Sequence, residues 1–323
     1  MRSTPEPVFV VGPPRSGTTL LSLMLGRHPQ IAFVGEFEWT WDFPSDTGDV
    51  ALTAYVEWLQ TNRHYLHHGP EIDASLDFDG LVRSFLDQMW EQGDPGRRKP
   101  LVGVQLHRHY HQAHRTWPRA RFIHIVRDGR DVCASWIAKG WTGNGFVAGE
   151  RWNRALEDWR TLEPSIPADR SIEVHFEKLV RDPGGELGKL CAFLGVEYSD
   201  ELLDYHTSTT YDPVDSKQAR KWPRSLSRRD LRLFESQSGD QLTRAGYPPS
   251  GEPPRTMLPA GILRLDNALR QNAGRVRNFG FAIWFAELFT RRLRLRTWHD
   301  RIQHRINAIE NRMLPRVIEG AQK

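Results

Sequence analysis

The feature that most restricts the fold is a short apolar strand followed at once by a glycine-rich loop and a helix. Residues 8–11 (Val-Phe-Val-Val) are wholly apolar, which is typical of a buried parallel strand. Residues 12–17 (Gly-Pro-Pro-Arg-Ser-Gly) are turn formers, and residues 18–27 carry apolar side chains at helical spacing. A strand, a loop and a helix in this order open a βα unit, which predicts a parallel sheet covered by helices.

Two later segments repeat the pattern of strand followed by helix. Residues 121–126 predict a strand that leads into a helix over 132–139. Residues 171–176 predict another strand, which precedes a helix near 185–194. Strands that alternate with helices predict an α/β fold, here a P-loop-type parallel sheet flanked by helices.

The segments between these units differ in character. Residues 39–100 predict helices, with loops at 44–48 and 93–100 where proline and glycine gather. Residues 136–152 contain four glycines, which predicts a flexible loop or lid.

The C-terminal part differs from the rest in composition and charge. Residues 247–259 are rich in proline and glycine and predict a linker. The domain that carries the chemistry is therefore expected at 1–250, and 251–323 is expected to hold the linker and a basic, arginine-rich helical extension. Residues 255–323 hold 14 Lys/Arg against 5 Asp/Glu. We expect this extension to contact a membrane surface or a second subunit in a homodimer, and we expect no nucleic acid partner.

Composition narrows the class of protein. Two cysteines, far apart in sequence, are too few for a disulfide scaffold or a metal site of their own. Residues 1–7 are short and polar, unlike a secretory signal, and the apolar run at 279–289 is too short to span a bilayer. We therefore expect a cytoplasmic protein that associates with membranes, if at all, through its extension.

The loop at 12–19 has the chemistry of an anion site. Unpaired amides at a helix start and the helix dipole favour a phosphate or sulfate group. Arg15 adds a planar cation, and Thr18 and Thr19 add hydroxyl donors. The pattern is close to a Walker A loop, but Thr18 stands where that loop has its lysine. This departure argues against ordinary ATP chemistry, although a nucleotide kinase or NTPase stays an alternative, as does a tight turn with no ligand.

This loop resembles the 5′-phosphosulfate loop of the sulfotransferases that use 3′-phosphoadenosine-5′-phosphosulfate (PAPS). The likeness is greatest to the branch that holds the tyrosylprotein sulfotransferases and many bacterial enzymes, where residues 28–31 and Gly35-Glu36 also have counterparts. The resemblance to this family extends over about residues 8–226 and implies a P-loop-type fold. The residues that it assigns to the donor's 5′ end are Pro14, Arg15, Ser16, Gly17, Thr18 and Thr19.

Further along the chain, the same family pattern implies three more donor contacts. Arg127 at a strand end and Ser135 eight residues later resemble the pair that binds the 3′-phosphate. Phe176 stands where relatives carry a tyrosine near the adenine. Lys221 and Trp222 resemble the pair that closes over the nucleotide. Ordinary ion pairing among Arg127 and its acidic neighbours is the alternative for the first pair.

The acceptor must lose a proton, and two residues are candidates for the base. Glu36 matches the glutamate of the tyrosylprotein branch, and His107 lies in a segment that resembles the Lys-Thr-His of cytosolic sulfotransferases. Gln105 stands where that segment has its lysine, and Lys99 is at the wrong spacing to replace it. Glu36 as an ion-pair residue and zinc binding by the local histidines are alternatives, although no closed ligand set is visible.

Together these patterns predict an enzyme that transfers a sulfuryl group from PAPS to a hydroxyl or amine and releases PAP. Catalysis would rest on Arg15 with Glu36 or His107, and the reaction requires no metal. The acceptor is expected to be a carbohydrate, lipid, small molecule or peptide, held by nearby aromatic side chains. Those expected at the acceptor are Phe37, Trp39, Trp41, Trp136 and Trp141. Besides a kinase, the rival interpretation is a degenerate, non-catalytic, membrane-associated module.

Overall fold

The computed structural model describes residues 6–43, 51–93, 99–252 and 258–293, with residues 298, 301–302, 305–306 and 309. Its described residues form two compact units. Of the described residues, those from 6 to 126 and from 158 to 215 belong to the first unit, and those from 127 to 157 and from 216 to 309 belong to the second.

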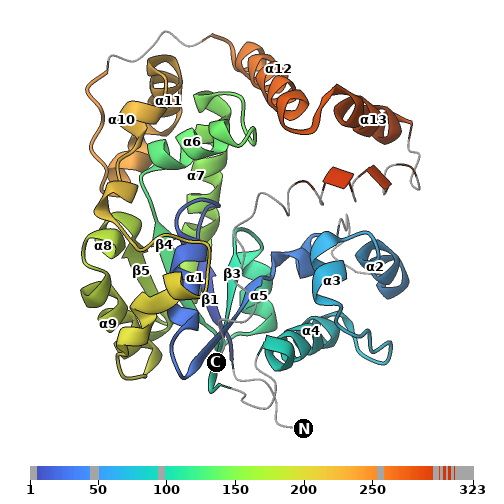
Figure 1. Ribbon diagram of the computed structural model, residues 1–323, viewed down its shortest axis with the longest axis vertical. Coiled ribbons are helices and arrows are strands. Elements are labelled where there is room, and N and C mark those ends of the chain that lie inside the picture. Colours follow the sequence, from blue (N-terminus) through green and yellow to red (C-terminus); the bar gives the residue numbers. More distant parts are fainter. Residues whose placement is uncertain are drawn as a thin grey trace. The chain divides into compact units, whose positions relative to one another are not determined.

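A five-stranded, wholly parallel sheet forms the centre of the first unit (Figure 1). Its strand order is β2-β3-β1-β4-β5, so β1 lies in the middle with β3 and β4 beside it. The strands are β1 (Val8–Val11), β2 (Ile31–Glu36), β3 (Leu101–Leu106), β4 (Arg121–Val126) and β5 (Ser171–His175). The central strand is buried at every position, as its apolar sequence predicts.

Helices connect these strands and confirm the predicted α/β class. Asp182 shows why one of them starts where it does, because its side chain accepts a hydrogen bond from the Gly185 amide just after Pro183. The helices of the first unit are α1 (Thr18–Gly26), α2 (Leu52–Leu59), α3 (Arg63–His68), α4 (Phe78–Gly93), α5 (Tyr110–Thr116), α8 (Phe176–Arg181) and α9 (Pro183–Leu194). Short 3-10 turns are η1 (Glu38–Trp41), η2 (Glu163–Ser165), η3 (Ala168–Arg170) and η4 (Asp200–Thr207). The expected loops at 44–48 and 93–100 lie largely outside the described residues.

The core of the first unit is rich in aromatic side chains, and this corrects one expectation. Phe37, Trp39 and Trp41 are 0, 1 and 6% exposed and pack within this core. Phe37 packs edge-on against both tryptophans at centroid distances of 6.0 and 5.6 Å. These three rings therefore hold the fold together and do not line an acceptor site.

The second unit is built from helices, including a segment that we expected to be flexible. Residues 145–162 form one long helix, α7 (Gly145–Leu162), which begins in the second unit and ends in the first. The other elements are α6 (Gly129–Ala138), η5 (Ser216–Gln218), α10 (Trp222–Ser225), α11 (Arg228–Arg244), α12 (Ala260–Phe279) and α13 (Phe281–Arg292).

Close packing explains three of the four glycines between residues 136 and 152, and a left-handed φ of +71° explains the fourth, Gly140. A Cβ atom on Gly145 would lie 2.0 Å from the Asp230 carbonyl oxygen, and one on Gly149 would lie 2.6 Å from the Ser238 hydroxyl. The predicted flexible loop is therefore wrong for most of its length, because α6 and α7 occupy it and α11 packs closely on α7. Trp136, expected at the acceptor, is 4% exposed in the core of this unit.

The C-terminal extension is helical over α12 and α13, as predicted, and most of the chain after residue 293 lies outside the described residues. No helix among the described residues is both long and apolar enough to cross a membrane. The division of the chain at residues 250 and 251 stays a prediction.

Candidate active site

The loop between β1 and α1 has the backbone shape of an anion cradle. Arg15 and Gly17 adopt left-handed conformations, with φ of +74° and +103°, on either side of Ser16. Such conformations turn successive amides toward one side and form a concave site for anions. Gly17 also precedes α1 without supplying a side-chain cap, so the first amides of the helix receive no hydrogen bond from it.

A buried hydroxyl inside this loop indicates that the cradle is built for a ligand. Ser16 is completely buried, and its Oγ has no hydrogen-bond partner among the described residues. Buried polar groups normally have partners, so an unpaired one at an anion cradle favours a bound group. A Cβ atom on Gly17 would lie 2.4 Å from the Phe176 ring, which places this predicted adenine-side residue directly against the loop.

A bulge in β2 positions Glu36 at the carboxyl end of the sheet. Phe33 pairs with Gly103 of β3, but Glu36, three residues later, pairs with Gln105, only two residues further along β3. The extra residue is accommodated beside Gly35, whose φ is +93°. Bulges of this kind re-aim a side chain, and here the residue that follows the glycine is the predicted base.

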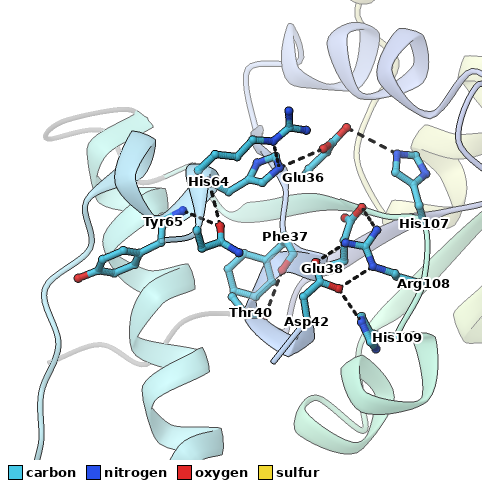
Figure 2. A network of polar contacts seen from close by, with 12 residues as sticks. Glu36, Phe37, Glu38, Thr40, Asp42, His64, Tyr65, His107, Arg108 and His109 are labelled. Atoms are coloured by element: carbon cyan, nitrogen blue, oxygen red, sulfur yellow. Dashed lines mark hydrogen bonds and ion pairs between the residues drawn. The ribbon is translucent and has the colours of Figure 1, made fainter. Parts of the chain in front are cut away.

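The structure brings together the two candidate bases, which the sequence offered as alternatives (Figure 2). His107 follows β3 directly, and its Nε2 lies 3.7 Å from Glu36 Oε1. Its Nδ1–H donates to the Gly12 carbonyl oxygen at 2.9 Å, which ties the ring to the anion loop. The His107 side chain is 8% exposed and that of Glu36 is 39% exposed, so Glu36 is the more accessible of the two.

Each member of this pair stabilises the charged form of the other. The adjacent His107 imidazolium lowers the pKa of Glu36 to about 2, against burial, which acts in the opposite direction. Burial lowers the pKa of His107, but the Glu38 and Glu36 carboxylates outweigh it and raise that pKa above its ordinary value. The arrangement therefore favours an ion pair at neutral pH.

Further charged groups surround the pair in Figure 2. Arg108 Nε donates to Asp42 at 2.6 Å, and its Nη1 lies 3.3 Å from Glu38. Burial raises the pKa of Glu38, whose side chain is only 5% exposed. His64 Nε2 lies 3.9 Å from the second oxygen of Glu36, and burial lowers the pKa of His64 to about 4. His64 is therefore neutral at pH 7, and the other full positive charge that lowers the pKa of Glu36 is that of the Arg63 guanidinium.

In the second unit, the predicted 3′-phosphate residues lie at the start and on the body of α6. Arg127 follows β4 in the chain, and its Nη2 donates to the Gln218 carbonyl oxygen at 3.0 Å and lies 3.5 Å from Asp131. Asp128 caps α6 by accepting a hydrogen bond from the Arg130 amide. Ser135 lies in α6, half-buried.

The Lys221-Trp222 pair is attached to the same end of α6. The Trp222 amide donates to Asp131 at 2.7 Å, and the Arg130 guanidinium lies 4.2 Å from the centre of the Trp222 ring. Asp131 thus contacts both Arg127 and Trp222, whereas the side chain of Lys221 is exposed. The roles of all these residues toward a nucleotide stay predictions.

Comparison with known proteins identifies the family. The family model described as "Sulfotransferase family" matches residues 7–200. The chain belongs to the sulfotransferase family. This sulfotransferase is 27% identical over 296 residues to Protein-tyrosine sulfotransferase 1 of Danio rerio, covering 81% of this chain and 78% of the relative. It is 26% identical to Protein-tyrosine sulfotransferase 2 of Gallus gallus, covering 76% of this chain and 71% of that protein.

A solved structure supports the fold of this sulfotransferase. The sulfotransferase domain from the curacin biosynthetic pathway superimposes with a TM-score of 0.54 at 17% identity, covering 76% of this chain and 99% of that one. At this identity the likeness concerns the fold alone. Because the chain belongs to this family, the kinase or NTPase interpretation is dropped. The absence of the Walker lysine had already argued against it.

One residue beside the loop of this sulfotransferase escaped the sequence analysis. The Tyr211 hydroxyl is hydrogen-bonded to Thr19 and lies within the electrostatic reach of Arg15. Burial raises the pKa of this phenol, so it stays protonated and able to donate. Thr19 in turn donates to Gln105 Oε1 at 3.4 Å. No motif surrounds Tyr211, and only the fold of residues 200–215 shows its position.

Lys99 and a bound metal ion are the two other cations that the sequence analysis considered near the site. Lys99 donates to the carbonyl oxygens of Gly26, His28 and Ile31, at 3.3, 2.9 and 3.2 Å, so its ammonium fastens the end of α1 to β2. Within the described part of the chain, no group of three or more His, Cys, Asp or Glu side chains is arranged to hold a metal ion.

Proposed function

We propose that this sulfotransferase transfers a sulfuryl group from PAPS to a hydroxyl group of an acceptor and releases PAP. The observation that carries the proposal is the buried, unpartnered Ser16 hydroxyl inside a loop of anion-cradle shape. The same loop is joined to the Glu36–His107 pair through the bond between His107 and the Gly12 carbonyl. An anion site and a proton acceptor therefore adjoin, as a transfer to a hydroxyl requires.

The proposed donor contacts follow the sequence prediction residue by residue. The 5′-phosphosulfate is assigned to the loop, residues 14–19, where Arg15 supplies the cation and Ser16, Thr18 and Thr19 supply hydroxyls. The 3′-phosphate is assigned to Arg127 and Ser135. The adenine side is assigned to Phe176, with Lys221 and Trp222 closing over the nucleotide.

When bound, PAPS supplies a sulfur atom with a good leaving group, the 5′-phosphate of PAP. The acceptor oxygen forms a new S–O bond as the bond from sulfur to the bridging oxygen breaks, and the acceptor proton passes to the protein. Negative charge that builds on the leaving phosphate is stabilised by Arg15, by the threonine hydroxyls and by the loop amides. These groups are held in place before reaction, so they need little reorganisation during it.

We assign the base to Glu36 and a positioning role to His107. Glu36 is the more exposed of the two, and its pKa of about 2 keeps it ionised throughout the neutral range. So weak a base takes the proton as the S–O bond forms, not before. His107 has its Nδ1 engaged by Gly12 and its Nε2 directed at Glu36, so it orients the carboxylate and fixes the pair against the anion loop.

A tyrosine phenol in a peptide is the first acceptor to test. This choice rests on the similarity to relatives that are named protein-tyrosine sulfotransferases. Carbohydrate, lipid and small-molecule hydroxyls are the other classes, and an amine is the alternative nucleophile. The cytoplasmic location stays a prediction, as does contact of the extension with a membrane surface or a second subunit.

The proposal is tested by incubating the protein with radiolabelled PAPS and a panel of tyrosine peptides, sugars, lipids and phenols. We expect transfer to at least one hydroxyl acceptor. Arg15→Ala should abolish transfer, and Glu36→Gln should reduce it by roughly 10²–10⁴-fold. If PAP binds but no acceptor in a broad panel is sulfated, the non-catalytic module becomes the better explanation.

A further inference from the structure

The last two described helices of the second unit form a helix–turn–helix pair, drawn in orange to red in Figure 1. Gly280 joins α12 to α13 with a φ of +84°. Arg275 of α12 donates to both carboxylate oxygens of Glu287 at 2.7 Å, and the Trp284 indole donates to Asn272 at 3.1 Å. These bonds fix the two helices against each other as one surface element.

In α13 the buried side is polar and the exposed side is apolar, which is the reverse of an ordinary surface helix. Its buried side carries Glu287 and Thr290, which are 6 and 3% exposed. Its outward side carries Phe281, Phe285 and Phe289, which are 63, 51 and 50% exposed. Their rings stack along the helix at centroid distances of 5.9 and 6.1 Å, which makes a continuous aromatic ridge.

The helix α12 repeats this arrangement with aliphatic side chains. Leu263 and Asn267 face the rest of the second unit, and Asn267 accepts a hydrogen bond from the Gly143 amide at 2.6 Å. The outward stripe carries Ile262, Leu265 and Leu269, which are 51, 61 and 64% exposed. Both helices thus have polar residues on the attached side, joined in α12 by the buried Leu263, and leave a row of large apolar residues exposed on the other side.

Charge indicates which kind of surface the α12–α13 helix pair can bind. Residues 258–293 contain six arginines but only two carboxylates, Asp266 and Glu287. Both carboxylates are already used within the unit, since Asp266 pairs with Arg229 and Arg270 and Glu287 pairs with Arg275. Arg264 is likewise paired, with Glu150. Two copies of this face would therefore bring the exposed Arg277 and Arg292 together with no other carboxylate in residues 258–293 to pair with them, whereas a negatively charged lipid surface complements the face.

We propose that the α12–α13 helix pair docks this sulfotransferase on the surface of an anionic bilayer. The aromatic ridge Phe281–Phe285–Phe289 enters the boundary between headgroups and acyl chains, and the exposed Arg277 and Arg292 contact anionic headgroups. The helices lie in the interface and do not span it. The helix pair lies outside residues 7–200, which match the family, so this role is separate from sulfuryl transfer.

Flotation of the full chain with vesicles tests the proposal. We expect the protein to float with vesicles of phosphatidylcholine and phosphatidylserine at low ionic strength, and to bind pure phosphatidylcholine at least tenfold more weakly. Phe285→Glu should lower binding to the anionic vesicles by at least tenfold, because it places a carboxylate in the ridge. The matched control is Leu66→Glu, which adds the same charge at a 45% exposed leucine in the first unit and should bind as the wild type does.

Circular dichroism and PAP affinity of both variants show that each is folded and that the nucleotide site is intact. The proposal is overturned if the wild type ignores anionic vesicles, or if Leu66→Glu loses as much binding as Phe285→Glu. It is also overturned if sedimentation shows a dimer that Phe285→Glu dissociates while vesicle binding is unchanged. In that case the face is a subunit interface.

Discussion

At the scale of single residues, the charges of Glu36 and His107 depend on each other. The carboxylate is held ionised mainly by His107, and burial alone would raise its pKa above the ordinary 4.5. The Glu36 carboxylate therefore stabilises the fold above its ordinary pKa, and this contribution is lost as the pH falls toward about 2. The contribution of His107, whose pKa is raised, is lost as the pH rises through that pKa.

Replacing His107 should make the titration of Glu36 visible. In His107→Gln the counter-charge is gone and burial stays, so the pKa of Glu36 should rise from about 2 toward its ordinary value of 4.5. We expect kcat/KM of the variant to fall as the pH drops below about 5, where the wild type shows no such limb. The measurement is the pH dependence of sulfate transfer, with PAP affinity recorded at each pH.

The opposite assignment of the base gives a different profile. If His107 were the base, the wild type would lose activity on the acid side of a pKa above 6.5, because the pKa of His107 is raised. Glu36→Gln would then slow transfer less than His107→Gln does. Either result would contradict the assignment of Glu36, provided that PAP affinity is unchanged in both variants.

Tyr211 offers a second test at this scale. Tyr211→Phe removes the hydroxyl that contacts Thr19 and keeps the ring. One neutral hydrogen bond is worth about 1 kcal/mol, so PAP affinity should fall by about fivefold in calorimetry. Tyr198→Phe, which alters a tyrosine that is 41% exposed, should leave the affinity unchanged. Equal affinities for all three proteins would remove Tyr211 from the donor site.

At the scale of elements, the bulge at the end of β2 sets the orientation of the Glu36 side chain. Gly35 makes the bulge possible, because it adopts a left-handed backbone conformation. A Cβ atom on Gly35 would meet nothing within 4 Å, so only its φ of +93° opposes a side chain. Gly35→Ala should therefore cost about 1 kcal/mol of unfolding free energy. Because any relaxation moves Glu36, we also expect slower turnover with PAP affinity retained.

Gly188 provides the matched control for this substitution. It lies within α9, also has open space around its Cβ position, and has an ordinary backbone conformation. Gly188→Ala should stabilise the protein by about 0.5–1 kcal/mol, since alanine is the better helix former. Thermal and urea unfolding measure both changes, and a Gly35→Ala protein as stable and active as the wild type would show that the bulge does not matter.

Elements with a strong local pattern were predictable, and those defined by packing were not. The apolar runs of β1 and β4 and the turn residues of the loop locate the sheet and its anion site, because periodicity and glycine chemistry are local properties. The glycines of α7 predicted flexibility, but they instead allow α11 to pack closely on this helix. Gly145 and its contact Asp230 are 85 residues apart, so the sequence alone does not reveal this packing. The pairing of Glu36 with His107 likewise depends on β2 lying beside β3, which no sequence spacing reveals.

At the scale of the whole molecule, nucleotide binding should stabilise the native state by mass action. A ligand present at about 100 times its Kd adds about 2.7 kcal/mol to the free energy of unfolding. PAP, AMP and ATP share the adenosine 5′-phosphate, but only PAP carries a 3′-phosphate. The proposed role of Arg127 therefore predicts protection by PAP well above that by AMP or ATP.

The variant Arg127→Ala should erase this preference without abolishing binding at the 5′ end. Losing a charge-assisted contact costs roughly 1.5–3 kcal/mol, so its affinity for PAP should fall by at least tenfold while its affinity for AMP stays the same. Thermal shifts and calorimetry measure both ligands, and Arg244→Ala, at the exposed end of α11, controls for the loss of a charge. An Arg127→Ala protein that still prefers PAP would place the 3′-phosphate elsewhere. Preferential protection of the wild type by ATP would instead count against PAPS as the donor.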